Sequence, residues 1–219
     1  MDMPYDVDFS QPYGQSLFSN NLKGKRMAQT KYVQIDAYLR WAKVFPENRD
    51  TAERARKNGV THKGVLKFLE KFDGQYMVDV IPATQDDLDK VKAALTDQLY
   101  GGNPRYKDIP DGPGTQVQFQ LSRKHDDKHV FKDRDTGEDK PVDFGGQPEI
   151  VWFNDTKGKN TPYDLETDGF IGNDTLAKVK FSVYMGGSEP SQSDTIRLEK
   201  LGIIDHVAYE SDGSTGDRF

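Results

Sequence analysis

The sequence predicts a mainly β protein with one to three helices, folded as a small barrel or sandwich. About six segments carry short strand patterns, whereas only one segment carries a long and clear helical pattern. Turn-forming residues separate the strand segments, as at residues 135–138 and 154–158. The 219 residues contain no internal repeat and suit one domain with insertions.

The first ordered segment is predicted to be a strand over residues 31–41. Its apolar residues Val33, Ile35, Ala37 and Leu39 alternate with larger polar or aromatic residues, which is typical of a strand with one buried face. A second strand is expected at residues 76–81, where Pro82 ends it. Later strands are expected at residues 116–124, 130–131, 149–154, 176–184 and 195–207.

Two helical insertions are expected in this sheet, at residues 46–73 and 84–100. In the first, residues 46–59 are helical or loose, and residues 60–72 place Val65, Leu66, Phe68, Leu69 and Phe72 on one helical face. In the second, Thr84 is the predicted N-cap and the first turn is acidic. Its apolar face consists of Leu88, Val91, Leu95 and Leu99, and Gly101-Gly102 ends it.

The charge is distributed unevenly along the chain. The net charge is −6, which by itself argues against a nucleic-acid binder. Residues 1–22 contribute −3 and residues 203–219 contribute another −3, so the body between them is neutral. Residues 40–71 hold nine basic residues against four acidic ones. The bulk charge therefore describes the two ends and leaves room for a basic site in the body.

Several function classes lack their usual signals. There is no cysteine, which excludes a disulfide scaffold, a thiolate metal site and a cysteine nucleophile, and suits a reducing cytosol. No apolar run approaches the ~18 residues of a membrane span, and the acidic start does not resemble a signal peptide. Phosphate-loop and Gly-x-Ser-x-Gly patterns are also missing. We therefore expect neither an enzyme nor a cofactor.

One histidine pair is the only metal-like feature. His125 and His129 would lie on one strand face or one helical turn apart, beside Asp126 and Asp127. No third ligand is signalled, so a solvated hairpin tip is the simpler interpretation and we expect no metal. A metal-assisted nuclease or hydrolase built on this pair is the least favoured of three functional hypotheses; the other two, a single-stranded-DNA-binding protein and a structural protein, follow below.

Basic residues interleaved with aromatic ones provide the positive functional signal. In the strand at 176–184, Lys178, Lys180 and Tyr184 share one face, and Trp41 and Lys43 follow the first strand in the same way. Cations that meet phosphates and rings that stack on bases are what single-stranded nucleic acid requires. The alternative is that Trp41, Trp152 and the tyrosines are core residues and that lysines guard a sheet edge.

The last third of the chain resembles the single-stranded-DNA-binding proteins of tailed bacteriophages. The resemblance is carried by Phe170 to Tyr184, with its Gly-rich turn and Lys-x-Lys strand, and by Ile196 to Glu210, followed by an acidic end and a terminal aromatic residue. Upstream, residues 76–82 and the helix after them are similar to a strand–Pro–helix unit of that family. The resemblance covers residues 30–219, and its motifs are most specific at 170–210.

This resemblance implies a five-stranded oligonucleotide/oligosaccharide-binding (OB) Greek-key barrel with insertions and extended termini. It also implies a non-enzymatic protein that coats unwound DNA, without sequence specificity, in phage replication, recombination and repair, in the cytoplasm of the infected host. Arg105 and Lys107 correspond to the family's basic loop. Phe219, with Asp217 and Asp212, corresponds to the tail that contacts the polymerase and helicase/primase. Arg218 interrupts the acidity of that tail.

The predicted organisation is an N-terminal tail (1–30), an OB domain (31–207) and a short acidic C-terminal tail (208–219). A homodimer is one arrangement that this hypothesis allows. The predicted DNA-binding residues are Lys178, Lys180, Tyr184, Arg105, Tyr106, Lys107, Arg123, Lys124, Trp41, Lys43 and Trp152. The alternative function is a phage or virion structural or assembly β-barrel protein that does not bind nucleic acid.

Overall fold

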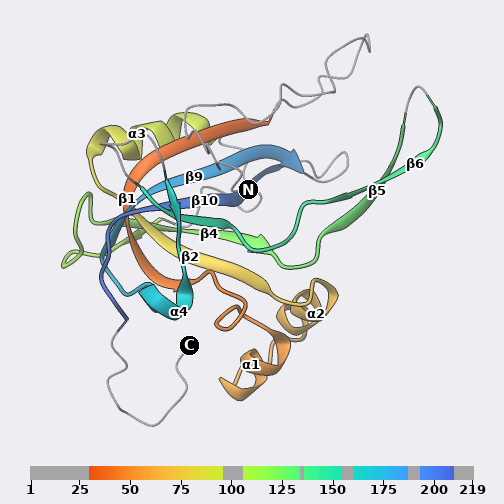
Figure 1. The fold of residues 1–219 in the computed structure, drawn as a ribbon, viewed down its shortest axis with the longest axis horizontal. Coiled ribbons are helices and arrows are strands. Elements are labelled where there is room, and N and C mark those ends of the chain that lie inside the picture. Colours follow the sequence, from red (N-terminus) through yellow and green to blue (C-terminus); the bar gives the residue numbers. More distant parts are fainter. Residues whose placement is uncertain (1–29, 96–105, 134–135, 154–159, 187–192, 210–219) are drawn as a thin grey trace, which may run out of the picture.

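Long antiparallel strands dominate the computed structural model, which describes residues 30–95, 106–133, 136–153, 160–186 and 193–209 (Figure 1). The prediction of a mainly β protein is confirmed, but the described residues include four helices where one to three were expected. In chain order the elements are β1 (Lys31–Lys43), α1 (Ala52–Lys57), α2 (Lys63–Lys71), β2 (Gln75–Pro82), α3 (Gln85–Ala94), β3 (Lys107–Asp108), β4 (Val117–Lys124), β5 (Lys128–Lys132), β6 (Asp139–Asp143), β7 (Glu149–Trp152), β8 (Thr161–Pro162), α4 (Leu165–Asp168), β9 (Thr175–Gly186) and β10 (Ser193–Asp205).

The main sheet has eight strands in the order β3-β4-β2-β1-β9-β10-β7-β8. Neighbouring strands run antiparallel except β7 and β10, which run parallel. The five longer strands lie in the order β4-β2-β1-β9-β10, which is consistent with an OB-like fold. The closed five-stranded barrel expected from the sequence is corrected in two respects. The described residues form a sheet of eight strands, and no ladder among them joins its edge strands β3 and β8 to close it.

The core lies against the inner face of this sheet. On β1, Val33, Ile35, Ala37 and Leu39 are buried as the alternation predicts. They pair across to β9, where Val33 opposes Phe181 and Ile35 opposes Val179. The buried face of β1 therefore follows from apolar side chains at every second position, since that period places them all on one side of the sheet.

Helices α1 and α2 fill the connection between β1 and β2 and lie beside the start of β2 (Figure 1). The connection is closed at its base by a bridge between Asp50 and Gln75. Gly74 (φ +94°) precedes this bridge, and a Cβ there would lie 2.5 Å from the Asp50 carbonyl oxygen. The close approach therefore requires glycine. An ion pair between Arg56 and Glu70 joins the two helices.

Helix α3 begins where the sequence predicts and packs at the other end of β1. Thr84 is its N-cap, and Leu88 and Val91 are buried as expected. The helix ends at Ala94, and Leu95 follows it with an extended backbone and a buried side chain. The rest of the predicted helix, including Leu99, lies outside the described residues. Strands β3, β6 and β8 and helix α4 were not predicted, because each is very short or carries proline and shows no period.

Replacing Thr84 with alanine should lower the free energy of unfolding by about 1 kcal/mol. The Thr84 hydroxyl accepts the Asp87 N–H at 3.2 Å and donates to the Asp87 carboxylate at 2.7 Å. Burial favours a higher pKa for Asp87, but hydrogen bonds from Lys90 and Thr84 outweigh it and hold that pKa low. A carboxyl group whose pKa is lowered by folding stabilises the fold at neutral pH, and this stabilisation is lost as the pH falls. Urea unfolding should therefore show a larger effect of the substitution at neutral pH than in acid.

Strands β5 and β6 form a separate two-stranded arm that projects away from the main sheet (Figure 1). Its cross-strand pairs match opposite charges, with Lys128 opposite Asp143 and Lys132 opposite Asp139. Val130 on the arm is 65% exposed.

Among the residues that the structure describes, no helix has the length and apolar character needed to cross a membrane.

Candidate nucleic-acid interface

The outer faces of β1, β2 and β4 form one continuous surface, which we call the outer face. It consists of the outward residues Arg40, Lys43, Met77, Asp79, Gln118, Gln120 and Ser122. In register, Asp79 lies between Arg40 and Gln120, and Met77 lies between Lys43 and Ser122. From Gln118 to Lys124 the surface follows β4 for about 20 Å.

A carboxylate bound by two amides occupies the middle of the outer face. The side-chain amide of Gln118 donates to Asp79 Oδ2 at 2.6 Å, and that of Gln120 donates to Oδ1 at 3.0 Å. Burial raises the pKa of Asp79, while the hydrogen bond from Gln120 and the charges of Lys107 and Lys43 oppose that rise. The centre of this face is therefore polar and acidic, and its cations lie around it.

One end of the outer face meets helix α2 in a basic–aromatic cluster, which we define as Phe68, Lys71, Phe72 and Lys124. The ammonium groups of Lys71 and Lys124 lie 4.9 and 4.1 Å from the centroid of the Phe72 ring. The Phe68 ring lies 4.9 Å from that of Phe72 and remains 38% exposed. Two elements far apart in sequence thus bring cations and rings together at one surface.

Helix α2 extends this cluster along its own length. Lys63, Lys67 and Lys71 are spaced four residues apart, so they form one stripe beside the exposed Phe68. All three are exposed, and none has an ion-pair partner in the described part of the chain. Because most other basic residues of the sheet are paired, this stripe is the largest group of available cations near the outer face.

Trp41 is the most exposed of the predicted rings whose side chains the structure describes. It is 60% exposed and sits at an irregularity of β1 with φ +50°, where its backbone N–H donates to Asn173 Oδ1 at 2.9 Å. It lines a shallow pocket with Lys43, Phe170 and Tyr209. Lys43 itself is paired with Asp50 at 2.6 Å. Trp41 is therefore available for stacking, whereas the Lys43 ammonium is already bound.

Arg123 has a different environment from the one predicted. Its guanidinium donates twice to the Gly145 carbonyl oxygen, at 2.8 and 3.2 Å, and pairs with Glu199 at 2.8 Å. It also approaches the Leu198 carbonyl oxygen at 3.4 Å, and its side chain is only 17% exposed. The position expected to meet phosphate thus connects β4 to β10. Its neighbour Lys124 pairs with Asp127 at 3.1 Å but keeps its place in the basic–aromatic cluster.

Two of the three residues predicted to share an open face on β9 are largely covered. Lys178 is paired with Asp36 on β1 at 2.6 Å and lies over the Phe153 ring, and Lys180 is only 9% exposed. Asp36 faces Lys178 directly across the ladder, so the opposite charge comes from the neighbouring strand. Tyr184 lies in β9 opposite Thr195, but its side chain lies outside the described part.

The remaining predicted residues are divided between the core and the surface. Tyr106 packs edge-on against Phe119, and burial raises the pKa of its hydroxyl. Lys107 is exposed on β3 opposite Gln118. Trp152 is half-buried, stacks on Tyr163 and donates its indole N–H to Asp168 at 2.8 Å. Arg105 and the tail residues Asp212, Asp217 and Phe219 lie outside the described residues.

The two histidines considered for a metal each contact a different carboxylate. His125 shares a hydrogen bond with the Tyr76 hydroxyl at 2.9 Å and lies 3.5 Å from Asp73, while His129 contacts Asp127 at 3.1 Å. Within the described ranges, no group of three or more histidine or carboxylate side chains is placed to hold a metal ion.

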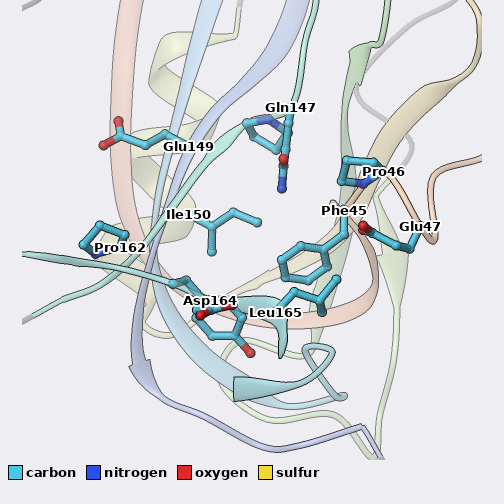
Figure 2. Close-up of a pocket in the computed structure, with 11 residues that line it drawn as sticks. Phe45, Pro46, Glu47, Gln147, Glu149, Ile150, Pro162, Asp164 and Leu165 are labelled. Carbon is cyan, nitrogen blue, oxygen red and sulfur yellow. The ribbon is translucent and has the colours of Figure 1, made fainter. Parts of the chain in front are cut away.

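A separate cleft of about 630 Å³ lies between the end of β1, the start of β7 and helix α4. Figure 2 shows Phe45, Ile150 and Leu165 around its floor. Its charged lining residues are Glu47, Glu149 and Asp164, and none of its lining residues is lysine or arginine. Acidic walls would repel phosphate, so this cleft does not belong to the candidate interface.

Sequence reasoning missed two parts of the candidate interface, Asp79 in its centre and the cluster on α2. A signal for the cluster was present, because residues 40–71 carry nine basic residues against four acidic ones and Lys63, Lys67 and Lys71 repeat at helical spacing. The sequence carries no signal for Asp79, since its two partners come from a strand about forty residues later.

Comparison with known proteins gives a distant structural likeness. No family model matches the chain, and no curated protein matches it. Among solved structures, it is similar to the crystal structure of gp2.5, a single-stranded DNA binding protein encoded by bacteriophage T7. The TM-score is 0.44 and the sequence identity 15%, over 84% of this chain and 92% of that chain. The function proposed below therefore rests on the residues of this chain.

Proposed function

We propose that this protein binds single-stranded DNA along the outer face and helix α2, without requiring a defined sequence. The basic–aromatic cluster is the observation that carries the proposal. Lys71 on α2 and Lys124 on β4 both lie over the Phe72 ring, and Phe68 remains exposed beside them. Cations for the phosphates and flat rings for unpaired bases are the two components that sequence-tolerant single-strand binding needs.

The place of the cluster in the fold supports the same proposal. In OB folds, oligonucleotides bind across the second and third strands and the loop between the first two. Here β2 and β4 are the second and third long strands, and α1 and α2 occupy the connection between the first two. Unpaired bases are needed for stacking, so a duplex should bind less tightly than a single strand.

Titration of the two tryptophans with a single-stranded oligonucleotide tests this function. We expect quenching at low salt that weakens steeply as salt rises, because bound phosphates release counterions. A duplex of the same length should quench less. No quenching at low salt, or quenching that salt does not change, would contradict the proposal.

A matched pair of variants shows which of the two tryptophans is quenched when DNA binds. Trp41→Phe should remove most of the quenching, because Trp41 is 60% exposed next to Lys43. Trp152→Phe should leave it, because Trp152 is half-buried against Tyr163 and bound to Asp168. Equal loss of signal in both variants would argue against contact at Trp41.

The narrower roles belong to the same proposal. We propose that the protein protects single strands during phage replication, recombination and repair in the infected host, and acts without catalysis. Residues 170–210 support this through their resemblance to the phage proteins, and Asp212, Asp217 and Phe219 would provide contacts to replication proteins.

One observation favours a second candidate function, a structural or assembly protein. The β5–β6 arm projects from the sheet and exposes Val130, which suits a protein contact. Light scattering separates the two candidates when combined with the titration. An assembly protein should form larger species without DNA and show no salt-dependent quenching.

A further inference from the structure

The carboxylate in the middle of the outer face has a fixed arrangement of partners. We call Asp79, Gln118 and Gln120 the Asp79 triad. Each glutamine amide nitrogen donates to a different oxygen of the carboxylate, at 2.6 and 3.0 Å. The opposite orientation of either amide would place its carbonyl oxygen against the carboxylate, so the donors are held inward.

This arrangement determines what the triad offers to a ligand. With one N–H of each amide directed at Asp79, the carbonyl oxygen of each glutamine and the remaining lone pairs of the carboxylate are left as acceptors, and each amide keeps one further N–H. Gln120 is exposed, and Asp79 and Gln118 are half-buried, so these acceptors can be reached from outside. The centre of the face therefore offers more acceptors than donors.

A bound strand would have to be oriented by this pattern. Phosphate oxygens are also acceptors and carry negative charge, so the triad repels them. Cations lie at the borders, with Lys107 opposite Gln118 at one end and Lys124 in the basic–aromatic cluster at the other. Phosphates are thus expected over the borders, with base edges over the triad.

We infer that the Asp79 triad accepts hydrogen bonds from the exocyclic amino groups of unpaired bases, so that the protein prefers strands rich in amino-bearing bases. Cytosine presents an N4 amino group and adenine an N6 amino group, whereas thymine and uracil present a carbonyl oxygen at the same place. This inference rests on the proposed function, and adds a preference for base composition to an affinity that stacking and phosphate contacts supply.

Oligo-dC and oligo-dU of equal length provide the direct test, because they share one backbone and differ on the base edge. Neither base carries the methyl group of thymine. We expect oligo-dC to bind about fivefold more tightly than oligo-dU in a fluorescence titration at one salt concentration. Equal affinities would overturn the inference and leave the proposed function standing. Failure of both oligonucleotides to bind at low salt would instead contradict the proposed function.

Two variants with the same change of charge separate hydrogen bonding from general electrostatics. Asp79→Asn should bring the oligo-dC to oligo-dU ratio close to one, because the new amide offers a donor to uracil. Asp36→Asn removes a carboxylate from the same sheet, where it is paired with Lys178, and should leave the ratio unchanged. A ratio that survives Asp79→Asn, or that Asp36→Asn removes equally, would overturn the inference.

Two further measurements complete the test. Thermal unfolding of both variants should show that the fold is kept, because one glutamine amide can rotate to accept a hydrogen bond from the amide that Asp79→Asn introduces. Oligo-rU should bind no more tightly than oligo-dU. A fivefold preference for oligo-rU would show that the triad accepts the 2′-hydroxyl instead of a base amino group, and would overturn the inference.

Discussion

Arg123→Ala is expected to lower the free energy of unfolding by about 3 kcal/mol. The guanidinium holds the Gly145 carbonyl oxygen with two hydrogen bonds and pairs with Glu199, and little of it is exposed. Removing it leaves these groups short of a donor, although Arg197 still contacts Glu199. For a domain of this size the melting temperature should fall by roughly 6 to 12 °C.

Arg123→Lys should recover only part of this stability, because an ammonium cannot reproduce the planar fork that reaches β10 and Gly145 together. Lys107→Ala is the matched control, since Lys107 is exposed and the described residues hold no ion pair for it. Urea or thermal unfolding measures all three variants. An Arg123→Ala protein of unchanged stability that lost DNA affinity would mean that Arg123 contacts phosphate after all.

The environment of Arg123 shows where sequence-based prediction stops. Period-2 alternation correctly places the five longer strands, since each strand's own residues decide which side is buried. The same alternation cannot say what a basic residue will meet across the sheet. Asp36 lies 142 residues before its partner Lys178, and Glu199 lies 76 residues after its partner Arg123. Pairing of this kind depends on strand order, which the sequence pattern does not contain.

The two tryptophans make the same point with opposite outcomes. Both occur in strand segments beside polar residues, and both are predicted to stack on bases. Trp152 instead stacks on Tyr163, because β7 packs against the segment that leads into helix α4. Trp41 is exposed because β1 continues past the start of β9, where an irregularity turns the backbone to positive φ. The local pattern places each ring on a strand, and tertiary packing decides its exposure.

The helical insertion is located correctly by the sequence pattern, but its role is not. The apolar positions of residues 60–72 predict a helix, and α2 is found there. Of that predicted apolar face, Leu69 is buried, whereas Val65 and Phe68 remain exposed. A short helix beside the end of a strand covers only part of its apolar stripe. The exposed remainder, with the lysine stripe next to it, makes the insertion part of the candidate interface.

The double charge reversal Lys67→Glu/Lys71→Glu is expected to weaken single-strand binding on the order of 100-fold at low salt, since each change removes an attraction and adds a repulsion. The slope of log affinity against log salt should become shallower by about 1.4, which is about 0.7 for each lost phosphate contact. Both lysines are exposed and unpaired in the described part of the chain, so their loss breaks no ion pair there. Fluorescence titration at several salt concentrations measures both quantities.

Lys31→Glu/Lys92→Glu is the matched control for this double variant. It changes the net charge equally, and its two lysines are exposed at the start of β1 and on α3, away from the basic–aromatic cluster. Because long-range repulsion is screened over about 10 Å at moderate salt, the control should lose only a few-fold in affinity and keep its salt slope. Equal losses in the two double variants would mean that binding responds to net charge alone. That result would separate α2 from the interface and remove the observation on which single-strand binding is proposed.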